Sequence, residues 1–338
     1  MLKIAIISIN QPSLNSAERL KEYLKEYEVD VYGKDGLEHN LKEFKSYEKI
    51  DTVLAEGWKK YDAIICILAM GIVVRKIAPL LKSKATDPAI LVMSIDLLKV
   101  IPLLSGHIGG ANELSDVIAN KIDGCINFIS TATDQVKAFA FDMFAKKNNM
   151  EIENLNCLAN ISNRLINKKS VKVFTLKAVF ESIKDKTNLK LIEKDCIDQN
   201  TVIINPLGKS DNLHLKPKLY IGIGCNRGTS FEDIQKAFLW FLDKYGIKKE
   251  QIKNIASFKA KADEKGLLEF AKKYNFDIKF FNKEEINNLD GEFSKSASTK
   301  FFGLKGVAEP SSILISKYKE LIIPKEVYEK KITIAGAI

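Results

Sequence analysis

The sequence predicts an α/β protein, with an N-terminal open α/β domain and a compact C-terminal α/β domain joined by a mixed α/β middle region. Strand-like apolar runs alternate with helical periodicity over roughly the first 130 residues, which is typical of an open α/β domain. The run at residues 63–68 is apolar throughout, as expected of a parallel strand covered on both faces. The alternation restarts at Leu219, after a charged stretch that contains Pro217.

These patterns divide the chain into three regions. We expect an N-terminal domain at residues 1–133, a middle region at 134–217 and a C-terminal domain at 218–338. A chain of 338 residues is long enough for two or three domains, each with its own core.

In the first region, a strand at residues 3–8, a turn at 10–12, a helix at 13–27 and a strand at 29–32 form a β-α-β unit. A polar connection leads to the strand at 63–68. There follow a helix limited by Pro79, strands within 84–96 and 99–106, a helix at 112–121 with Leu114, Val117, Ile118 and Ile122 facing inward, and a strand at 127–130. Ligands of open α/β sheets bind where strands end. The segments that we expect to follow strands are residues 70–71, 86–88 and 105–110.

In the middle region the pattern of residues is less regular. It predicts helices at 139–147 and 177–185, strands at 170–175, 189–194 and 201–206, and a polar connection that ends at 215–218.

In the last region strands and helices alternate again, as in the first. The pattern predicts a strand at 219–224, a glycine-bounded loop and a helix at 230–245 capped by Thr229 or Ser230. It also predicts a strand edge, a turn and a helix within 255–274, a strand at 276–281, a helix within 306–316 and a strand at 331–338.

Composition limits the classes of function. The formal net charge of +9 and the pI near 9.0 favour anionic partners, namely nucleic acid, a membrane surface or a polyacidic small molecule. The five cysteines include no CxxC pair, which argues against a disulfide framework or zinc finger and for a reducing compartment. The longest apolar run, residues 63–74, is too short to span a bilayer. We expect a soluble cytoplasmic protein.

The run at residues 101–116, IPLLSGHIGGANELSD, is the first candidate for a small-molecule site. A strand, a glycine-rich turn and a helix start leave backbone N–H groups and a helix dipole that favour negative charge. The run also gathers a histidine, a serine, an amide and two acids. A structural reading is equally open, because glycines allow tight turns, Asn112 could be an N-cap, and Glu113 and Asp116 suit a first helical turn. The context of His107 favours the functional reading of this run, because its neighbours include glycines and it does not lie in an apolar stripe.

A second glycine loop, GIGCNRGTS at residues 222–230, has neither the P-loop nor the GxGxxG spacing. Arg227 could grip a carboxylate with two hydrogen bonds. Cys225 could be a nucleophile if its pKa were lowered, although a small buried residue is the more frequent case.

Other short motifs have structural readings when taken singly. KADEKG at 261–266 could be a solvated helix start, GVAEP at 306–310 a helix entrance, Arg75 and Lys76 a solvated helix face, and Asp87 a turn former before Pro88.

Taken together, these motifs are far more specific. MGIVVRKIAPLLKSKATDPAIL, VIPLLSGHIGGANELS, YIGIGCNRGTS, KADEKGLLEFA and GVAEPSSILIS occur in one order at fitting separations. The chain resembles the cobalamin biosynthesis protein CbiG family, the cobalt-precorrin-5A hydrolases of anaerobic vitamin B12 synthesis. The resemblance covers residues 63–133 and 219–338, whereas the middle region corresponds in position only.

The resemblance implies a cobalt-tetrapyrrole substrate whose ring-A acetate is closed as a δ-lactone. Water opens the lactone, and the methylated meso carbon leaves as acetaldehyde to give cobalt-precorrin-5B. The acetate and propionate groups of such a substrate would explain the net charge of +9 without nucleic acid. Cobalt would arrive with the substrate, so we expect no cofactor and no protein-bound metal. A homodimer is compatible with the sequence, and no nucleic-acid or membrane partner is expected.

Lactone opening needs an activated water, donors for an oxyanion, and proton transfer. We predict His107 as general base and Glu113 as a second acid/base or the orienter of His107. Gly109 and Gly110 would supply oxyanion donors, with Ser105 and Asn112 as further donors. The predicted substrate-binding residues are Arg75, Lys76, Asp87, Ser105, Gly106, Gly109, Gly110, Asn112, Cys225, Arg227, Thr229, Lys261, Glu264 and Glu309. Because motif residues occur in both terminal domains, the sequence favours a site between them.

The competing hypothesis is a non-catalytic protein that binds a corrinoid or another polyanion. The chain lacks the interleaved aromatic residues of RNA-binding strands, and this hypothesis leaves His107 without a role. Binding that falls steeply with salt, without acetaldehyde release, would favour it.

Overall fold

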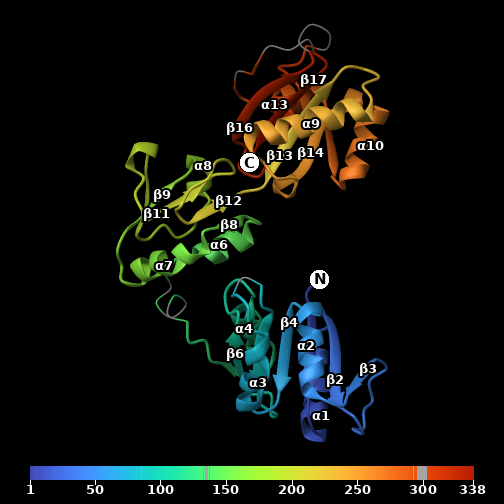
Figure 1. Cartoon of the computed structure of the whole chain (residues 1–338), viewed down its shortest axis with the longest axis vertical. Helices are drawn as coiled ribbons and strands as arrows, with labels where there is room; N and C mark the ends of the chain where they lie inside the picture. The colour runs from blue at the N-terminus through green and yellow to red at the C-terminus, as the bar shows by residue number, and fades with distance from the viewer. Residues whose placement is uncertain (85, 132, 134–135, 137, 292, 295–302) are drawn as a thin grey trace. The chain divides into compact units, whose positions relative to one another are not determined.

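The structure is a computed structural model that describes residues 1–84, 86–131, 133, 136, 138–291, 293–294 and 303–338. The chain divides into two compact units, Met1–Ala138 and Phe139–Ile338. The first unit contains a seven-stranded sheet and the second contains two five-stranded sheets. Figure 1 shows that each unit combines strands with helices. This mixed α/β architecture confirms the predicted fold class.

The seven-stranded sheet of the first unit has the order β3-β2-β1-β4-β5-β6-β7. Neighbouring strands from β3 to β5 are parallel, β6 is antiparallel to β5, and β7 is parallel to β6. The strands are β1 (Lys3–Ser8), β2 (Glu28–Lys34), β3 (Phe44–Tyr47), β4 (Ala63–Ile67), β5 (Ala89–Met93), β6 (Lys99–Leu104) and β7 (Ile126–Asn127).

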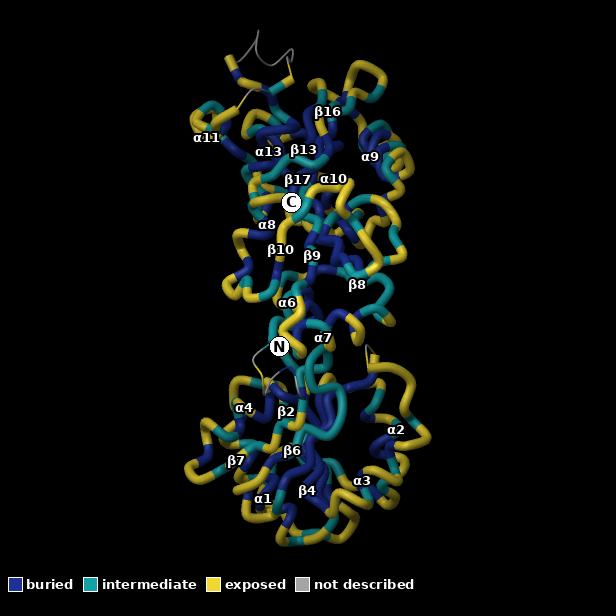
Figure 2. The backbone as a smooth tube through the Cα atoms, turned by 90° about the vertical axis from the view of Figure 1, so that its left-hand side faces the viewer, coloured by how far each residue is buried: buried dark blue, intermediate teal, exposed yellow. Residues whose placement is uncertain are grey.

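Helices cover both faces of this sheet, as the wholly apolar strands predict. Helices α1 (Gln11–Tyr23) and α4 (Ala111–Lys121) pack on the face that carries Ile4 and Ile6. Helices α2 (Ile50–Lys60) and α3 (Met70–Ile77) pack on the opposite face, and a 3₁₀ turn, η1 (Ala78–Leu80), follows α3. In Figure 2 the strand β4 at the centre of the sheet is buried, whereas many connecting segments are exposed.

Two parts of the first unit differ from the sequence prediction. Residues 10–12 are not a turn, because Asn10 Oδ1 accepts a hydrogen bond from Ser13 N at 3.0 Å and Ser13 Oγ accepts one from Asn10 N at 3.1 Å. This reciprocal cap starts α1 at Gln11, and Pro12 is tolerated in a first turn that leaves N–H groups without helical partners. The polar connection before residue 63 contains β3 and α2.

The second unit begins with a five-stranded sheet of order β10-β9-β11-β12-β8. The only antiparallel pair in this order is that of β12 with the edge strand β8. Residues 214–216, predicted as part of a polar connection, form β12. The elements are α6 (Phe141–Lys147), β8 (Glu151–Glu153), α7 (Leu158–Ile166), β9 (Val171–Phe174), α8 (Lys177–Glu181), β10 (Leu189–Leu191), β11 (Thr201–Ile204) and β12 (His214–Lys216).

The last sheet has the order β15-β14-β13-β17-β16, with β13, β14 and β15 parallel and β17 antiparallel to β13. The hairpin partner β16 was not predicted. The elements are β13 (Leu219–Cys225), α9 (Phe231–Tyr245), β14 (Ile252–Phe258), α10 (Lys265–Tyr274), β15 (Ile278–Phe281), α11 (Lys283–Asn287), α13 (Ala308–Ile315), β16 (Leu321–Tyr328) and β17 (Ile332–Ala337), with a 3₁₀ turn η5 (Lys259–Lys261).

Helix α13 lies directly on β13, because Gly222 has no side chain. A Cβ atom at Gly222 would lie 1.8 Å from the carbonyl oxygen of Ala308 and 2.8 Å from the nitrogen of Ser312. Glycine is therefore required here for close approach of helix and sheet backbones.

Candidate functional site

The glycine-histidine loop, residues 105–110, lies at the edge of the sheet where β5 begins. Strand β6 is antiparallel to β5, and Leu104 at its end pairs with Ile90. The prediction that residues 86–88 follow a strand is wrong, because they lead into β5 at Ala89. Residues 70–71 do follow β4, and so lie at the other edge of the sheet.

Close packing shapes the loop. Ser105 has a φ of +57°, and a Cβ atom at Gly109 would lie 2.3 Å from the Cβ of Ser105. The cap of α4 is Gly110, at a φ of +88°, rather than the expected Asn112. Asn112 is instead a buried residue of the first helical turn, and its Oδ1 lies 2.6 Å from the position of a Cβ on Gly106. The glycines therefore let the loop fold back on itself.

Main-chain hydrogen bonds hold the loop and occupy the start of α4. The N–H of Gly110 donates to the carbonyl of His107 at 3.0 Å, that of Ala111 to Ser105 at 3.2 Å, and that of Asn112 to Gly106 at 3.0 Å. The N–H of Gly110 would have to leave His107 before it could bind an oxyanion.

Asp87 and Ser105 join the loop to the segment before β5. The Ser105 hydroxyl donates to the carbonyl oxygen of Asp87 at 2.9 Å. The Asp87 carboxylate accepts from the backbone nitrogens of Lys82 and Ser83, each at 3.0 Å, and Asp87 is only 6% exposed. In this conformation the Asp87 carboxylate supports the local backbone.

The segment that follows β7 also reaches the loop, and sequence reasoning missed it. Thr133 Oγ1 lies 3.3 Å from His107 Nε2, and Asn112 Nδ2 donates to Thr131 Oγ1 at 3.3 Å. The sequence does carry a signal, namely the polar run that follows the strand predicted at 127–130. The structure thus brings together His107, Asn112, Thr131 and Thr133.

Other residues predicted for the first unit lie on the helices. Glu113 is exposed in the first turn of α4. On α3, Arg75 donates to the carbonyl of Gly71 at 3.1 Å and Lys76 pairs with Asp51 at 2.8 Å. Substrate carboxylates would have to displace the second of these contacts or share it.

In the C-terminal domain the structure brings together a charged cluster, formed by Arg227, Lys261, Asp263 and Glu264. It lies where β13 and β14 end, as expected for parallel strands. Arg227 bonds to Asp263 at 2.5 Å, and Glu264 Oε2 lies 3.7 Å from Arg227 and 3.6 Å from Lys261.

Glu264 is the buried member of this cluster, and its carboxylate lies near both cations. It is only 4% exposed, and its Oε1 accepts from the backbone N–H of Gly228 at 2.9 Å. A buried carboxylate between two cations orients them, which is a different role from the direct substrate contact that we predicted.

Cys225 and Thr229 lie beside the charged cluster. Burial raises the pKa of the Cys225 thiol, and the nearby Lys261 charge offsets this only in part. A raised pKa disfavours the thiolate that nucleophilic catalysis needs. Thr229 donates to the carbonyl of Asn226 at 2.8 Å, and the cap of α9 is Ser230, which accepts from Asp233 at 3.2 Å.

Glu309 is buried on α13, at 4% exposure. Its carboxylate accepts from the nitrogen of Ser294 at 2.8 Å, from the Ser294 hydroxyl at 3.0 Å and from the nitrogen of Lys325 at 3.0 Å. These bonds tie α13 to β16 and give Glu309 a structural role in this conformation.

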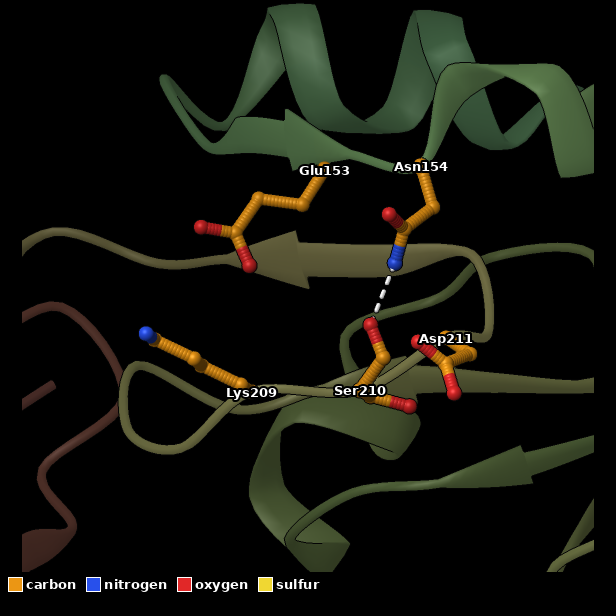
Figure 3. Close-up of a pocket in the computed structure, with 5 residues that line it drawn as sticks. All are labelled: Glu153, Asn154, Lys209, Ser210 and Asp211. Atoms are coloured by element: carbon orange, nitrogen blue, oxygen red, sulfur yellow. Dashed lines mark hydrogen bonds between the residues drawn. The ribbon is translucent and has the colours of Figure 1, made fainter.

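The middle region has a cavity of about 660 Å³ that the sequence did not predict, lined by Glu153, Asn154, Lys209, Ser210 and Asp211 (Figure 3). Two buried residues of β12 lie near the Glu153 carboxylate. Lys216 pairs with the Glu153 carboxylate at 2.9 Å, and His214 Nδ1 lies 3.6 Å from it. His214 Nε2 lies 2.8 Å from the carbonyl oxygen of Asn205.

Acidification is expected to destabilise the fold through His214. Burial lowers the pKa of His214 below its usual 6.5, more than the bond to Asn205 raises it. The unfolded chain therefore binds a proton at His214 more readily than the folded chain does. This group's contribution to the free energy of unfolding is complete above pH ~6.5 and is lost as the pH drops toward the folded-state pKa. We expect His214→Gln to flatten this fall in urea midpoints between pH 7.5 and 5.5. The exposed His39→Gln is the control, and an unchanged slope in His214→Gln would contradict the assignment.

Within the described part of the chain, no helix has the length and apolar character needed to cross a bilayer. No group of three or more His, Cys, Asp or Glu residues that could hold a metal ion occurs among the residues that the structure describes.

Comparisons with known proteins give one consistent result. Three family models match in succession: cobalamin synthesis G N-terminal at residues 52–134, cobalamin biosynthesis central region at 139–220 and cobalamin synthesis G C-terminus at 219–337. A cobalt-precorrin-5A hydrolase of Priestia megaterium is 27% identical over 95% of this chain and 91% of its own length. A probable cobalt-precorrin-5A hydrolase of Methanocaldococcus jannaschii is 28% identical over 94% and 90%. A solved structure described as a cobalamin biosynthesis protein G homologue, from Sulfolobus solfataricus, is 26% identical over 99% of this chain and 96% of its own, with a TM-score of 0.41.

Proposed function

Because the chain belongs to the cobalamin synthesis G family, we infer that it is a cobalt-precorrin-5A hydrolase of anaerobic cobalamin biosynthesis. The observation that carries this inference is that the N-terminal, central and C-terminal family models of cobalamin synthesis G all match this chain. They match in that order, from residue 52 to residue 337. The relatives that share this function align over most of their own length and of this chain, so the whole protein is compared rather than one domain.

We propose that the reaction is lactone hydrolysis followed by carbon-carbon cleavage. Water adds to the lactone carbonyl, and the ring oxygen leaves as an alkoxide and is protonated. A base then removes the hydroxyl proton, the carbon-oxygen double bond forms, and the bond from this carbon to the macrocycle breaks. The electron pair of that bond passes into the macrocycle, and the two-carbon unit departs as acetaldehyde. A single proton-transfer group near neutral pKa can serve these steps in turn.

His107 is the proposed general base, and Glu113 the proposed second acid/base or orienter. His107 is supported by its place in a loop whose shape is fixed by main-chain bonds and by the contact with Thr133. The proposed substrate carboxylate ligands are Arg75, Lys76, Arg227 and Lys261. The buried Glu264 supports the roles of Arg227 and Lys261, because its carboxylate lies within 4 Å of both cations where β13 and β14 end.

The corrinoid product tests this function. Anaerobic incubation of the purified protein with cobalt-precorrin-5A is expected to give a product that has gained water and lost a C₂H₄O unit by mass spectrometry. Unchanged cobalt-precorrin-5A that stays tightly bound would instead support the non-catalytic corrinoid binder.

A Cys225→Ser variant is expected to keep wild-type turnover, because the raised pKa of the Cys225 thiol in the wild type opposes a covalent thioester route. The matched control is Cys196→Ser, at an exposed cysteine in the middle region. Turnover that is lost in Cys225→Ser and kept in Cys196→Ser, with both proteins folded, would argue for the thiol as nucleophile.

The proposal assigns no cofactor and no resident metal to the protein, since cobalt enters with the substrate. It also takes the reaction to be cytoplasmic and independent of nucleic acid. A homodimer is an expectation that light scattering on the purified protein would test.

A further inference from the structure

A buried hydroxyl lies beside the imidazole of His107. Thr133 is 6% exposed, and its Oγ1 lies 3.3 Å from His107 Nε2. A polar side chain at this depth needs a hydrogen-bond partner, and one within hydrogen-bond reach is the ring nitrogen of the proposed base. Thr133 lies outside the sequence motifs described above.

Two further hydrogen bonds are made at Thr133 and at the nearby Thr131. The carbonyl of Thr133 accepts from the N–H of Ala138 at 2.9 Å. Two residues earlier, Thr131 Oγ1 accepts from Asn112 Nδ2, and Asn112 itself bonds through its N–H to Gly106. The segment that follows β7 therefore contacts the glycine-histidine loop and its helix through two threonine side chains. None of these hydrogen bonds uses the imidazole of His107.

We propose that Thr133 is the positioning residue of His107: it holds the imidazole at Nε2 and keeps the ring oriented while the proton moves. This inference rests on the proposed role of His107 in the hydrolase. A hydroxyl suits the task, because it can donate to a neutral ring nitrogen or accept from a protonated one. It therefore stays hydrogen-bonded in both states of a general base, whereas a backbone carbonyl could only accept.

The hydroxyl also favours the protonated ring. A hydrogen bond from a cationic N–H is stronger than one from a neutral group, so removal of the hydroxyl stabilises the neutral form relative to the imidazolium. Thr133→Val keeps the shape of the side chain and removes the hydroxyl, whereas Thr133→Ser keeps the hydroxyl. The matched control is Thr52→Val, at an exposed threonine in the first turn of α2.

Two readouts test the proposal. In Thr133→Val we expect kcat to fall roughly ten- to hundred-fold with KM little changed, because a misoriented base costs rate rather than binding. The acid limb of the kcat/KM profile should move down by roughly 0.5 to 1 pH unit. Thr133→Ser should restore most of both, and Thr52→Val should match the wild type.

The second readout needs no substrate. The chain has three histidines, so the imidazole resonances of His107 can be assigned by nuclear magnetic resonance with a His107→Gln reference. We expect the His107 titration midpoint to fall in Thr133→Val and to return in Thr133→Ser. An unchanged midpoint and ring tautomer would overturn the positioning role even if the wild type proves to have no hydrolase activity. Acetaldehyde release by the wild type with equal rates and pH profiles for Thr133→Val would overturn it while leaving the proposed function intact.

Discussion

Replacement of His107 by alanine is expected to lower kcat for acetaldehyde release roughly 10²- to 10⁴-fold, which is the usual contribution of a general base. The bonds that shape the glycine-histidine loop run between main-chain atoms of residues 105–112, so loss of the imidazole leaves them in place. Binding of the corrinoid, measured by its change in absorbance, should therefore be close to that of the wild type.

His39→Ala is the matched control for this experiment. His39 stacks on Phe44 with ring centroids 4.0 Å apart, so this variant removes an imidazole from the same unit at a site without a proposed catalytic role. It should keep wild-type kcat. Undiminished turnover in His107→Ala would remove His107 from the mechanism and direct attention to Glu113.

A Gly222→Ala substitution is expected to destabilise the C-terminal domain by about 3 kcal/mol or more, because the new Cβ would overlap main-chain atoms of α13. The overlap with the Ala308 carbonyl oxygen, at 1.8 Å, can be relieved only by moving the helix away from the sheet. Urea denaturation followed by the fluorescence of Trp240, which lies on α9, would measure the loss.

The matched variant is Gly336→Ala on the neighbouring strand β17. A Cβ there would first meet the Cδ1 of Ile323 at 3.3 Å, which is the end of a flexible side chain. We expect a clearly smaller loss of stability. Equal losses in the two variants would show that close approach of α13 is not what Gly222 provides.

Much of the first sheet could be predicted because burial on both faces demands continuous apolar strands. The strand β4 is such a case, since all five of its residues are buried. Helix α2 was missed although Val53, Leu54 and Gly57 form its buried face. The length of the connection would have predicted that β6 is antiparallel to β5. Residues 94–98 are too few for the crossover that a parallel pair needs.

The candidate site was predictable only as far as local sequence determines it. The glycine spacing identified the loop at residues 105–110. The sequence did not predict that Arg227 and Lys261 both lie near Glu264, because this depends on the pairing of β13 with β14. The contact between His107 and Thr133 depends on the pairing of β7 with β6, which residue types do not specify. The buried state of Glu309 likewise depends on partners in a distant loop and strand.

The most direct test of the proposed function is acetaldehyde itself, measured by coupled enzymatic reduction when the protein meets cobalt-precorrin-5A without oxygen. One acetaldehyde for each corrinoid converted, with little from His107→Ala, is the result that we predict. Conversion of no corrinoid and release of no acetaldehyde by folded wild-type protein that binds the substrate would contradict the hydrolase function.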